Sequence, residues 1–368
     1  MTASRAARTR PSAVPSECWY AVAASADVGR DLIAARVVDR ALVLFRTAGG
    51  AAVALDDRCA HRPYPLSAGR LDGDLLRCGL CGFTYDSTGR CVSVPTQSRV
   101  PLGASVQAHP VREEHGVVWV WLGEPGRAGL HRLPDLWWLD DAGWATVGAE
   151  RDVRAGLLLL HESFADVTQI PVLAPDVSPA VLQAKPPPLE VEVTETTVSL
   201  RRGFPPGPLP GWQARALGRP DHEAFEHRQE GHFLSPAAWV DHWDVLLPDG
   251  DPARMRFTQL VTPVDSGASR LLWRVSRDFA VADGSTTARL AEMFTSYYAR
   301  VAGALETVQQ VIDRDGPGPE VNVSADVAAL KVRQIVRTML AEQGDAPAAR
   351  GGRRSAAAPA RRLLAGSS

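Results

Sequence analysis

Short apolar runs separated by turn residues fill the first third of the chain. The runs and the turn pairs between them are Ala41–Phe45, Gly49-Gly50, Ala51–Leu55, Asp72-Gly73, Leu75–Cys78, Thr88-Gly89 and Gly116–Gly123. Runs of this length that end at glycine-containing pairs are typical of β-strands joined by tight turns. The part from Trp19 to about Glu124 is therefore predicted to be a small all-β domain.

The rest of the chain mixes helical and strand patterns after a glycine-rich linker at Gly123–Gly129. The expected elements are a helix near Leu157–Val167, a proline-rich stretch at Pro171–Pro188, strand alternation at Leu189–Phe204, strands at Ala253–Thr262 and Arg270–Asp278, and helices from about Thr287 to Arg314 and from Ser324 to Glu342. We predict an α+β chain with domains at 17–126 and 127–343. Residues 1–16 and 344–368 are predicted to be a disordered arm and tail.

Composition narrows the class of protein. The chain has 368 residues, 45% of them apolar, and a net charge of −2, which gives no reason to expect a nucleic-acid or anionic-membrane partner. No apolar run is long enough to span a bilayer, and the arginines of the N-terminus precede no apolar signal segment. Five cysteines in this length are no disulfide framework, so we expect a reducing, cytoplasmic location.

The strongest chemical signal is Cys59-Ala-His61 followed, sixteen residues later, by Cys78-Gly-Leu-Cys81. Two short loops would each supply two ligands. Thiolates and imidazole suit zinc or an iron–sulfur cluster rather than magnesium or calcium. From the ligands alone, a structural zinc site with three cysteines and one histidine stays an alternative.

The stretch Asp56–Pro95 closely resembles a Rieske [2Fe–2S] domain. That family has the pattern C-x-H, fifteen to seventeen residues, and C-x-x-H, followed by a Gly-aromatic turn and an aromatic-Asp pair. The turn and the pair are matched here by Gly82, Phe83, Tyr85 and Asp86. Cys81 stands where the family has its second histidine. The resemblance implies a [2Fe–2S] cluster held by Cys59, His61, Cys78 and Cys81. A third thiolate adds one negative charge, so the reduction potential should fall below the usual Rieske range. Cys18 and Cys91 are then left as buried apolar residues.

The order of segments along the whole chain resembles that of the catalytic α-subunit of Rieske non-haem iron oxygenases, most closely the vanillate-demethylase-like group. The motifs that carry the resemblance are "CWYAVAAS", "VREEHGVVWVWLGEP" and "LPDLWWLDDAGW". It implies an oxygenase-like, helix-grip second domain. It also implies a trimer in which the cluster of one subunit reduces a mononuclear iron in its neighbour. Two histidines and a carboxylate hold that iron.

The ligand positions of that second metal have changed. In "ESFADVTQIPVLA", Asp166 takes the position of the aspartate that bridges the two metal centres, which makes it the candidate catalytic residue. Gln169 and Ala174 take the positions of the two histidines, and Val301 that of the carboxylate. Alanine and valine cannot bind iron, so the resemblance implies that no mononuclear iron site remains.

Other histidines could form a relocated iron site. His161 with Asp166 is one option. His222, His227 and His232 recur every five residues, which fits neither a strand face nor a helix face, and His242 follows. The favoured interpretation is that these are ordinary core or surface histidines.

Three functions follow from this. The favoured one is an electron-transfer or accessory subunit of the oxygenase family that has lost its mononuclear iron. It would form a homotrimer, or a hetero-oligomer with a catalytic Rieske oxygenase paralogue, and take electrons from an external reductase or ferredoxin. The alternatives are an active oxygenase with an unrecognised iron site and a zinc-binding scaffold. No dinucleotide fingerprint or P-loop indicates a reductase module within the chain.

Overall fold

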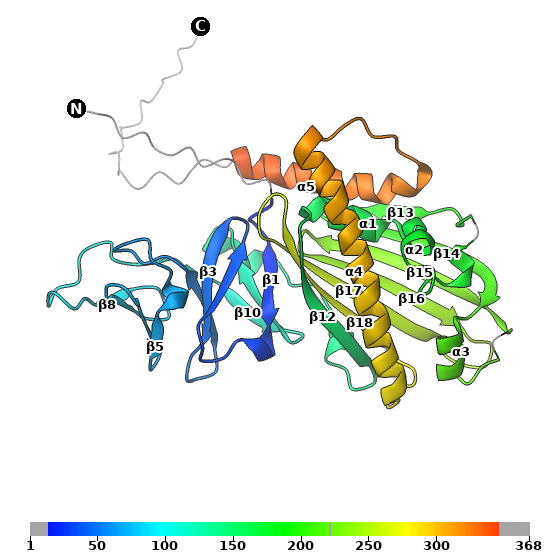
Figure 1. Cartoon of the computed structure of the whole chain (residues 1–368), viewed down its shortest axis with the longest axis horizontal. Coiled ribbons are helices and arrows are strands. Elements are labelled where there is room, and N and C mark those ends of the chain that lie inside the picture. The colour runs from blue at the N-terminus through cyan, green and yellow to red at the C-terminus, as the bar shows by residue number, and fades with distance from the viewer. Residues whose placement is uncertain (1–13, 184, 221, 346–368) are drawn as a thin grey trace, which may run out of the picture.

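The computed structural model describes residues 14–183, 185–220 and 222–345 (Figure 1). Most of the predicted arm and tail therefore lies outside the described residues. Small sheets occupy the N-terminal end, and a large sheet with helices on one face occupies the other (Figure 1). The α+β class and the all-β N-terminal part are as predicted.

Three small antiparallel sheets form the N-terminal part, in the orders β1-β11-β10, β2-β3-β4-β9 and β5-β6-β7-β8. Their strands are β1 (Trp19–Ala24), β2 (Ile33–Val37), β3 (Arg40–Arg46), β4 (Ala52–Asp56), β5 (Arg70–Asp72), β6 (Leu75–Arg77), β7 (Thr84–Tyr85), β8 (Cys91–Ser93), β9 (Ala108–His109), β10 (Val111–Glu114) and β11 (Val117–Trp121). The sheet β5–β8 shares a second core with β3 and β4, which includes Phe45, Leu55, Leu66, Leu76 and Tyr85. This sheet lies at the end of the molecule remote from the large sheet (Figure 1).

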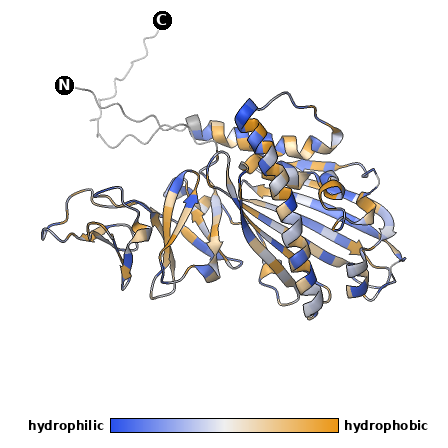
Figure 2. Cartoon of the chain, viewed as in Figure 1, coloured by the Kyte–Doolittle hydropathy of each residue, from blue (hydrophilic) through white to orange (hydrophobic). Residues whose placement is uncertain are grey.

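A seven-stranded antiparallel sheet, in the order β12-β18-β17-β16-β15-β14-β13, dominates the second part. Its strands are β12 (Ala145–Val153), β13 (Glu190–Val193), β14 (Val198–Pro208), β15 (Ala224–Ser235), β16 (Ala238–Leu246), β17 (Ala253–Pro263) and β18 (Ser269–Arg277). Apolar and polar residues alternate along them (Figure 2). The strand alternation expected at Leu189–Phe204 is formed by the hairpin β13–β14, in which the chain turns at Thr194–Thr197.

Five α-helices complete the second part. They are α1 (Leu157–Ala165), α2 (Ile170–Leu173), α3 (Gly211–Ala216), α4 (Gly284–Asp315) and α5 (Val327–Asp345). The long helix α4 crosses one face of the sheet (Figure 1). Asp283 caps its N-terminus, where the side-chain oxygen accepts from the backbone N–H of Ser285, and Gly316 ends it with a positive φ of 79°. The expected linker at Gly123–Gly129 overlaps a 3₁₀ turn, η3 (Pro125–Leu130).

The two parts are joined by direct contacts. The backbone N–H of Val38 donates to Pro263 at 2.7 Å, and the indole N–H of Trp19 donates to His131 at 3.1 Å. Cys18 and Cys91 are free and buried, as expected. Among the described residues, no helix is long and apolar enough to cross a membrane.

Candidate metal centre and ligand cavity

Three of the predicted ligands converge in the sheet β5–β8. Cys59 follows strand β4, whereas Cys78 and Cys81 lie in the loop between β6 and β7. Their three sulfur atoms lie within 4.8 Å of one another, and the Sγ atoms of Cys59 and Cys81 are 3.6 Å apart. Cys59 and Cys78 are buried and Cys81 is half-buried. Segments about twenty residues apart in sequence thus form one thiol cluster.

His61, the fourth predicted ligand, is placed differently. It is exposed, and its ring stacks on Phe83 with 4.9 Å between ring centres and an angle of 10°. Its ring nitrogens do not belong to the group of atoms that are mutually within 4.8 Å. A cluster with two irons divides its ligands between two metals, so all four need not be this close. The four-ligand assignment remains a prediction.

The loop between β6 and β7 is a tight knuckle that turns both cysteines inward. The N–H of Gly82 donates to the carbonyl of Cys78, and the N–H of Cys78 donates to that of Phe83. Gly82 has a φ of 73°, which favours glycine, and a Cβ on Gly79 would lie 2.6 Å from the carbonyl oxygen of Ala68. The two glycines allow the close approach that brings the thiols together.

Electrostatics at the cluster favours a bound cation. Burial raises the pKa of Cys81 to about 12, and the neighbouring thiols add to this. Burial also acts on Cys59, but hydrogen bonds from the Tyr85 hydroxyl and from nearby backbone N–H groups outweigh it and lower its pKa. Two thiolates this close repel each other unless a metal holds both, so the donor set fits a thiolate-bound metal or cluster.

The region of the expected second metal begins at the end of α1. Asp166 is half-buried, and its Oδ1 accepts from the backbone N–H of Thr168 at 2.9 Å and from its hydroxyl at 2.6 Å. The side-chain amide of Gln169 donates to the hydroxyl of Ser163 at 2.6 Å and to its carbonyl. The polar side chains here are therefore bonded to their own segment rather than aimed at a common point.

The other two changed positions lie in the same region. Ala174 follows α2 and is fully buried, and Val301 lies on α4 with 2% of its surface exposed. Helices α2 and α4 contact each other, and Arg300 on α4 forms a bidentate ion pair with Asp176, at 2.6 and 3.0 Å. None of the three side chains can supply a strong iron ligand in this packed environment.

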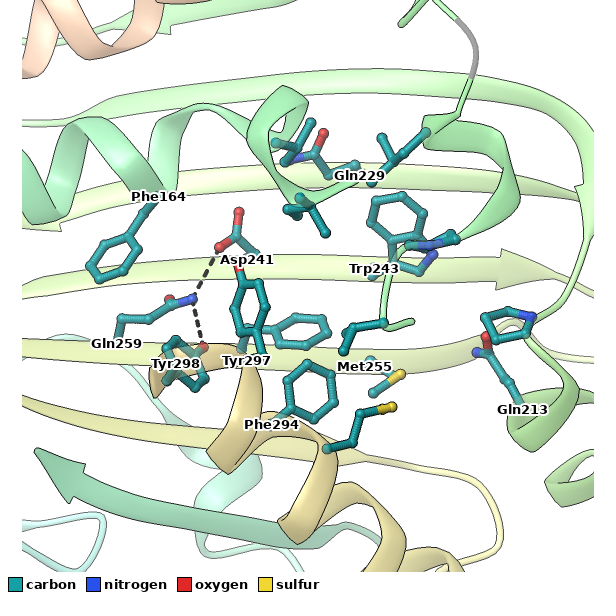
Figure 3. Close-up of a pocket in the computed structure, with 18 of the residues that line it drawn as sticks. Phe164, Gln213, Gln229, Asp241, Trp243, Met255, Gln259, Phe294, Tyr297 and Tyr298 are labelled. Carbon is teal, nitrogen blue, oxygen red and sulfur yellow. Dashed lines mark hydrogen bonds between the residues drawn. The ribbon is translucent and has the colours of Figure 1, made fainter. Parts of the chain in front are cut away.

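An apolar cavity of about 100 Å³ lies between the sheet and the helices α1, α2 and α4. Its wall includes Phe164, Trp243, Met255, Phe294, Tyr297 and Tyr298 (Figure 3). Asp166 also lines it, and Asp241 on β16 projects into its middle (Figure 3). Gln169, Ala174 and Val301 are not among the lining residues.

Family profiles match both parts of the chain. The Rieske [2Fe–2S] domain matches residues 18–109, and the vanillate O-demethylase oxygenase C-terminal domain matches residues 153–342, more than half of the chain. The chain belongs to the vanillate O-demethylase group of Rieske oxygenases. The resemblance inferred from its motifs is confirmed, and its first domain is of the type that binds a [2Fe–2S] cluster.

Relatives are similar over nearly their whole lengths. The putative iron–sulfur subunit of the toluene-4-sulfonate monooxygenase system of Comamonas testosteroni is 27% identical, covering 89% of this chain and 97% of that protein. A vanillate O-demethylase oxygenase subunit of a Pseudomonas species is 26% identical, covering 85% and 98%. The crystal structure of dicamba monooxygenase bound to 3,6-dichlorosalicylic acid superposes with a TM-score of 0.80 at 22% identity, covering 90% and 98%. This similarity shows the fold.

The histidines of this Rieske-family chain separate onto two faces of the large sheet. An interval of five residues is odd, so His227 and His232 point to opposite sides of β15. His227 is buried and accepts from the indole of Trp243 at 3.2 Å. His161 is also buried, and its Nε2 lies 2.9 Å from the carbonyl of Pro236. These two are core histidines, as the favoured interpretation had it.

His232 and His242 meet Glu230 on the face of the sheet opposite the cavity. The three ligand atoms lie within 4.8 Å of one another, with His232 Nε2 at 3.7 Å and His242 Nδ1 at 3.8 Å from the Glu230 carboxylate. The Nδ1 of His232 is 3.0 Å from the Ser199 hydroxyl, which orients the ring. Two histidines and one carboxylate could hold a divalent metal. The sequence pattern did not group these three residues, because β15 and β16 were not predicted.

The polar residues of the cavity were also missed from the sequence. Gln229 and Asp241 face the cavity from β15 and β16, whose alternation in "AFEHRQEGHF" and "AWVDHWDV" is the signal that could have located them. Burial raises the pKa of Asp241 to about 7, although the nearby donors Trp239, Gln259 and Gln229 oppose the shift.

This raised pKa predicts a pH dependence of stability. The folded protein keeps the Asp241 proton to about pH 7, whereas the unfolded chain loses it near pH 4. The free energy of unfolding should therefore fall as pH rises between those values, by about 1.4 kcal/mol for each unit of pKa difference. Asp241→Asn should flatten this slope in urea unfolding between pH 4.5 and 7.5. The control is Asp244→Asn, on the opposite face of β16, which should keep the slope of the unmodified protein. An equal slope in both variants would contradict the assignment of the slope to Asp241.

A second prediction concerns Tyr85. Its hydroxyl lies 3.2 Å from the Cys59 sulfur and accepts from the N–H of Ala60 at 3.0 Å. A hydrogen bond to a cluster thiolate stabilises the more negative, reduced state. Tyr85→Phe should lower the midpoint potential by about 40 mV, the equivalent of about 1 kcal/mol for one electron. Tyr64→Phe, in the neighbouring loop, is the matched control for protein-film voltammetry, and a fall of the same size there would refute the specific role of Tyr85.

Proposed function

We propose that this chain is a Rieske-type [2Fe–2S] protein that acts as an electron-transfer or accessory subunit and has lost the mononuclear iron site of its family. Cys59, His61, Cys78 and Cys81 would hold the cluster, which would carry one electron at a time. The chain's own part is to bind the cluster, to tune it through Tyr85 and to dock with a partner.

One observation carries the proposal. The positions at which the family binds its oxygen-activating iron are occupied by Gln169, Ala174 and Val301, and the amide of Gln169 is already bonded to Ser163. Asp166, at the bridging position, accepts from Thr168 and faces the buried guanidinium of Arg202. The carboxylate therefore has a local hydrogen-bond partner without either metal centre.

The partners follow from the arrangement of the chain. The sheet β5–β8, in which the thiols converge, and the large sheet, which carries the cavity, lie towards opposite ends of the molecule (Figure 1), so the cluster would serve a site in another subunit rather than its own cavity. Several relatives are named as a subunit or component of an oxygenase system. We therefore propose a homotrimer or a hetero-oligomer with a catalytic paralogue, located in the cytoplasm and reduced by a separate reductase or ferredoxin.

The test is the iron, sulfide and zinc content of the anaerobically purified chain, read with its electron paramagnetic resonance spectrum. Two irons and two sulfides per chain, with no substrate oxidation when a competent reductase is added, are expected. One zinc and no sulfide would instead support a structural zinc scaffold held by the same cysteines. Three irons per chain would support an active oxygenase.

The cluster of Glu230, His232 and His242 is the observation that favours the active-oxygenase alternative. It has the ligand types that non-haem iron oxygenases use. Its position on the face of the sheet away from the cavity weakens this candidate, since iron there could not act on a molecule in the cavity. If a third iron is found, its loss from the His232→Ala/His242→Ala variant and its retention in His227→Ala would place it there.

A further inference from the structure

The cavity contains hydrogen-bonding atoms that the protein leaves without a partner. Among the described residues, four such buried atoms belong to lining side chains: Asp241 Oδ1, Gln229 Oε1, Gln213 Nε2 and Trp212 Nε1. A buried polar atom without a partner costs about 1–3 kcal/mol, so four around one small space are unusual. Their common feature is that side chains lining one cavity carry them.

Asp241 is held in place for such a contact. Its Oδ2 accepts from the indole N–H of Trp239 at 2.8 Å, which fixes the carboxyl group and leaves Oδ1 towards the cavity. With its amide turned over, Gln259 donates to the carbonyls of Phe257 and Trp239 at 3.0 Å each and accepts from the Tyr298 hydroxyl at 3.1 Å. That orientation satisfies the whole Gln259 amide, and we adopt it over the direct contact to Asp241 drawn in Figure 3. In this orientation Gln259 no longer donates to Asp241, whereas the Trp239 indole still does.

The backbone of β15 lets Asp241 pack closely against it. Gly231 on β15 lies directly opposite Asp241 on β16. A Cβ at this glycine would lie 2.8 Å from the ring of Trp239 and 3.0 Å from both Asp241 Oδ1 and Leu200 Cδ1. Glycine at this strand position therefore permits the carboxyl group and the indole ring to lie directly against the strand. Gln229, two residues before it, adds a second acceptor on the same face.

The charge of the cavity excludes one class of ligand. Among the described residues, the charged side chains that line it are those of the two acids Asp166 and Asp241, and no described arginine, lysine or histidine lines it. Arg202 on β14 acts on Asp166 but is not part of the wall. The other titratable groups that line the cavity are the phenols of Tyr297 and Tyr298 on α4. An anion would meet two carboxyl groups and no cation, whereas an N–H or O–H donor would meet acceptors.

The volume of the cavity and the side chains of its wall limit the size and the polarity of the rest of the ligand. About 100 Å³ of apolar space is somewhat less than the 150 Å³ of an engineered cavity that binds benzene. The side chains of Met255 and Met293 line it and can adjust to a slightly larger ring.

We infer that this cavity binds a small apolar ring compound that carries an amine or hydroxyl donor and no negative charge, with Asp241 as the residue that selects it. The donor lies against Asp241 Oδ1 and Gln229 Oε1, and the ring packs on the aromatic wall. The inference concerns binding alone, so it stands whether or not the chain holds a mononuclear iron.

Four probes of one size test the inference by isothermal titration calorimetry on the full chain: benzylamine, benzyl alcohol, toluene and benzoate. Benzylamine and benzyl alcohol should bind at least tenfold more tightly than toluene, and benzoate should be the weakest. Fluorescence of the tryptophans, two of which, Trp212 and Trp243, line the cavity, gives a second readout. Benzoate binding as tightly as benzylamine, or the absence of binding by any probe at millimolar concentration, would overturn the inference.

Variants test whether Asp241 is the residue that selects the ligand. Asp241→Asn should weaken benzylamine at least tenfold and strengthen benzoate, because the new amide can donate to a carboxylate. Asp244→Asn, the same exchange on the other face of β16, should change neither. At pH 6 the benzylammonium ion should displace the Asp241 proton, so titrations in buffers of different ionisation enthalpy should show proton release in the unmodified chain. This measurement does not depend on the variant folding, and release of the same number of protons with toluene would contradict the role of Asp241.

Discussion

The Gln169→His/Ala174→His/Val301→Asp variant is expected to bind one more Fe(II) per chain than the unmodified protein. The exchanges restore two imidazoles and a carboxylate, the ligand set of non-haem oxygenases, at the positions where the family has them. Ala174 and Val301 are buried, so larger or charged side chains there should destabilise the metal-free variant by about 1–3 kcal/mol or more. At a free iron concentration one hundred times its Kd, binding should increase the free energy of unfolding by about 2.7 kcal/mol. The melting temperature of the variant should therefore rise.

The measurement is iron content after anaerobic reconstitution, together with differential scanning calorimetry with and without Fe(II). The matched control is Gln169→His/Ala174→His/Val301→Asn, which keeps the shape of the third side chain but offers no carboxylate and should bind iron at least tenfold more weakly. The single variant Ala174→His shows whether this buried position accepts the ring. Equal iron in the variant and the unmodified chain would refute the assignment of the lost site.

The second large effect is on the cluster itself. Cys81→His should raise the reduction potential by at least about 100 mV, into the range of roughly −150 to +300 mV that is found with two histidine ligands. The cause is charge: a neutral imidazole in place of a thiolate removes one negative charge beside a centre that becomes more negative on reduction. The position of Cys81, with its sulfur 3.6 Å from that of Cys59, is what makes it the ligand to exchange.

Protein-film voltammetry across pH 5–10 measures both the potential and its pH dependence. The unmodified chain should show at most one ionising imidazole, that of His61, and the variant should show a second. Cys18→Ser, a free buried cysteine outside the thiol cluster, is the control and should leave the potential unchanged. A potential that stays constant in Cys81→His would exclude Cys81 from the ligands of the cluster.

The local parts of this protein were readable from the sequence because their signals are local. The turn glycines, the two cysteine loops and the apolar runs of the first domain each lie within a few neighbouring residues. The long helix was predicted from about Thr287 to Arg314 and runs from Gly284 to Asp315, since its apolar periodicity is continuous. The proposed loss of ligands at Gln169, Ala174 and Val301 likewise comes from the motifs alone, and the reconstitution experiment tests it.

What the tertiary structure decided depends on pairing between distant strands. The sequence suggested ordinary histidines at positions 227, 232 and 242, but only the register of β15 against β16 brings His232 and His242 to Glu230 while sending His227 to the opposite face. Register is set by the whole sheet, and one residue of shift would reverse every face. The cavity has the same origin: Asp241 and Gln229 meet there because antiparallel strands place residues from different segments side by side, and no short stretch of sequence contains that information.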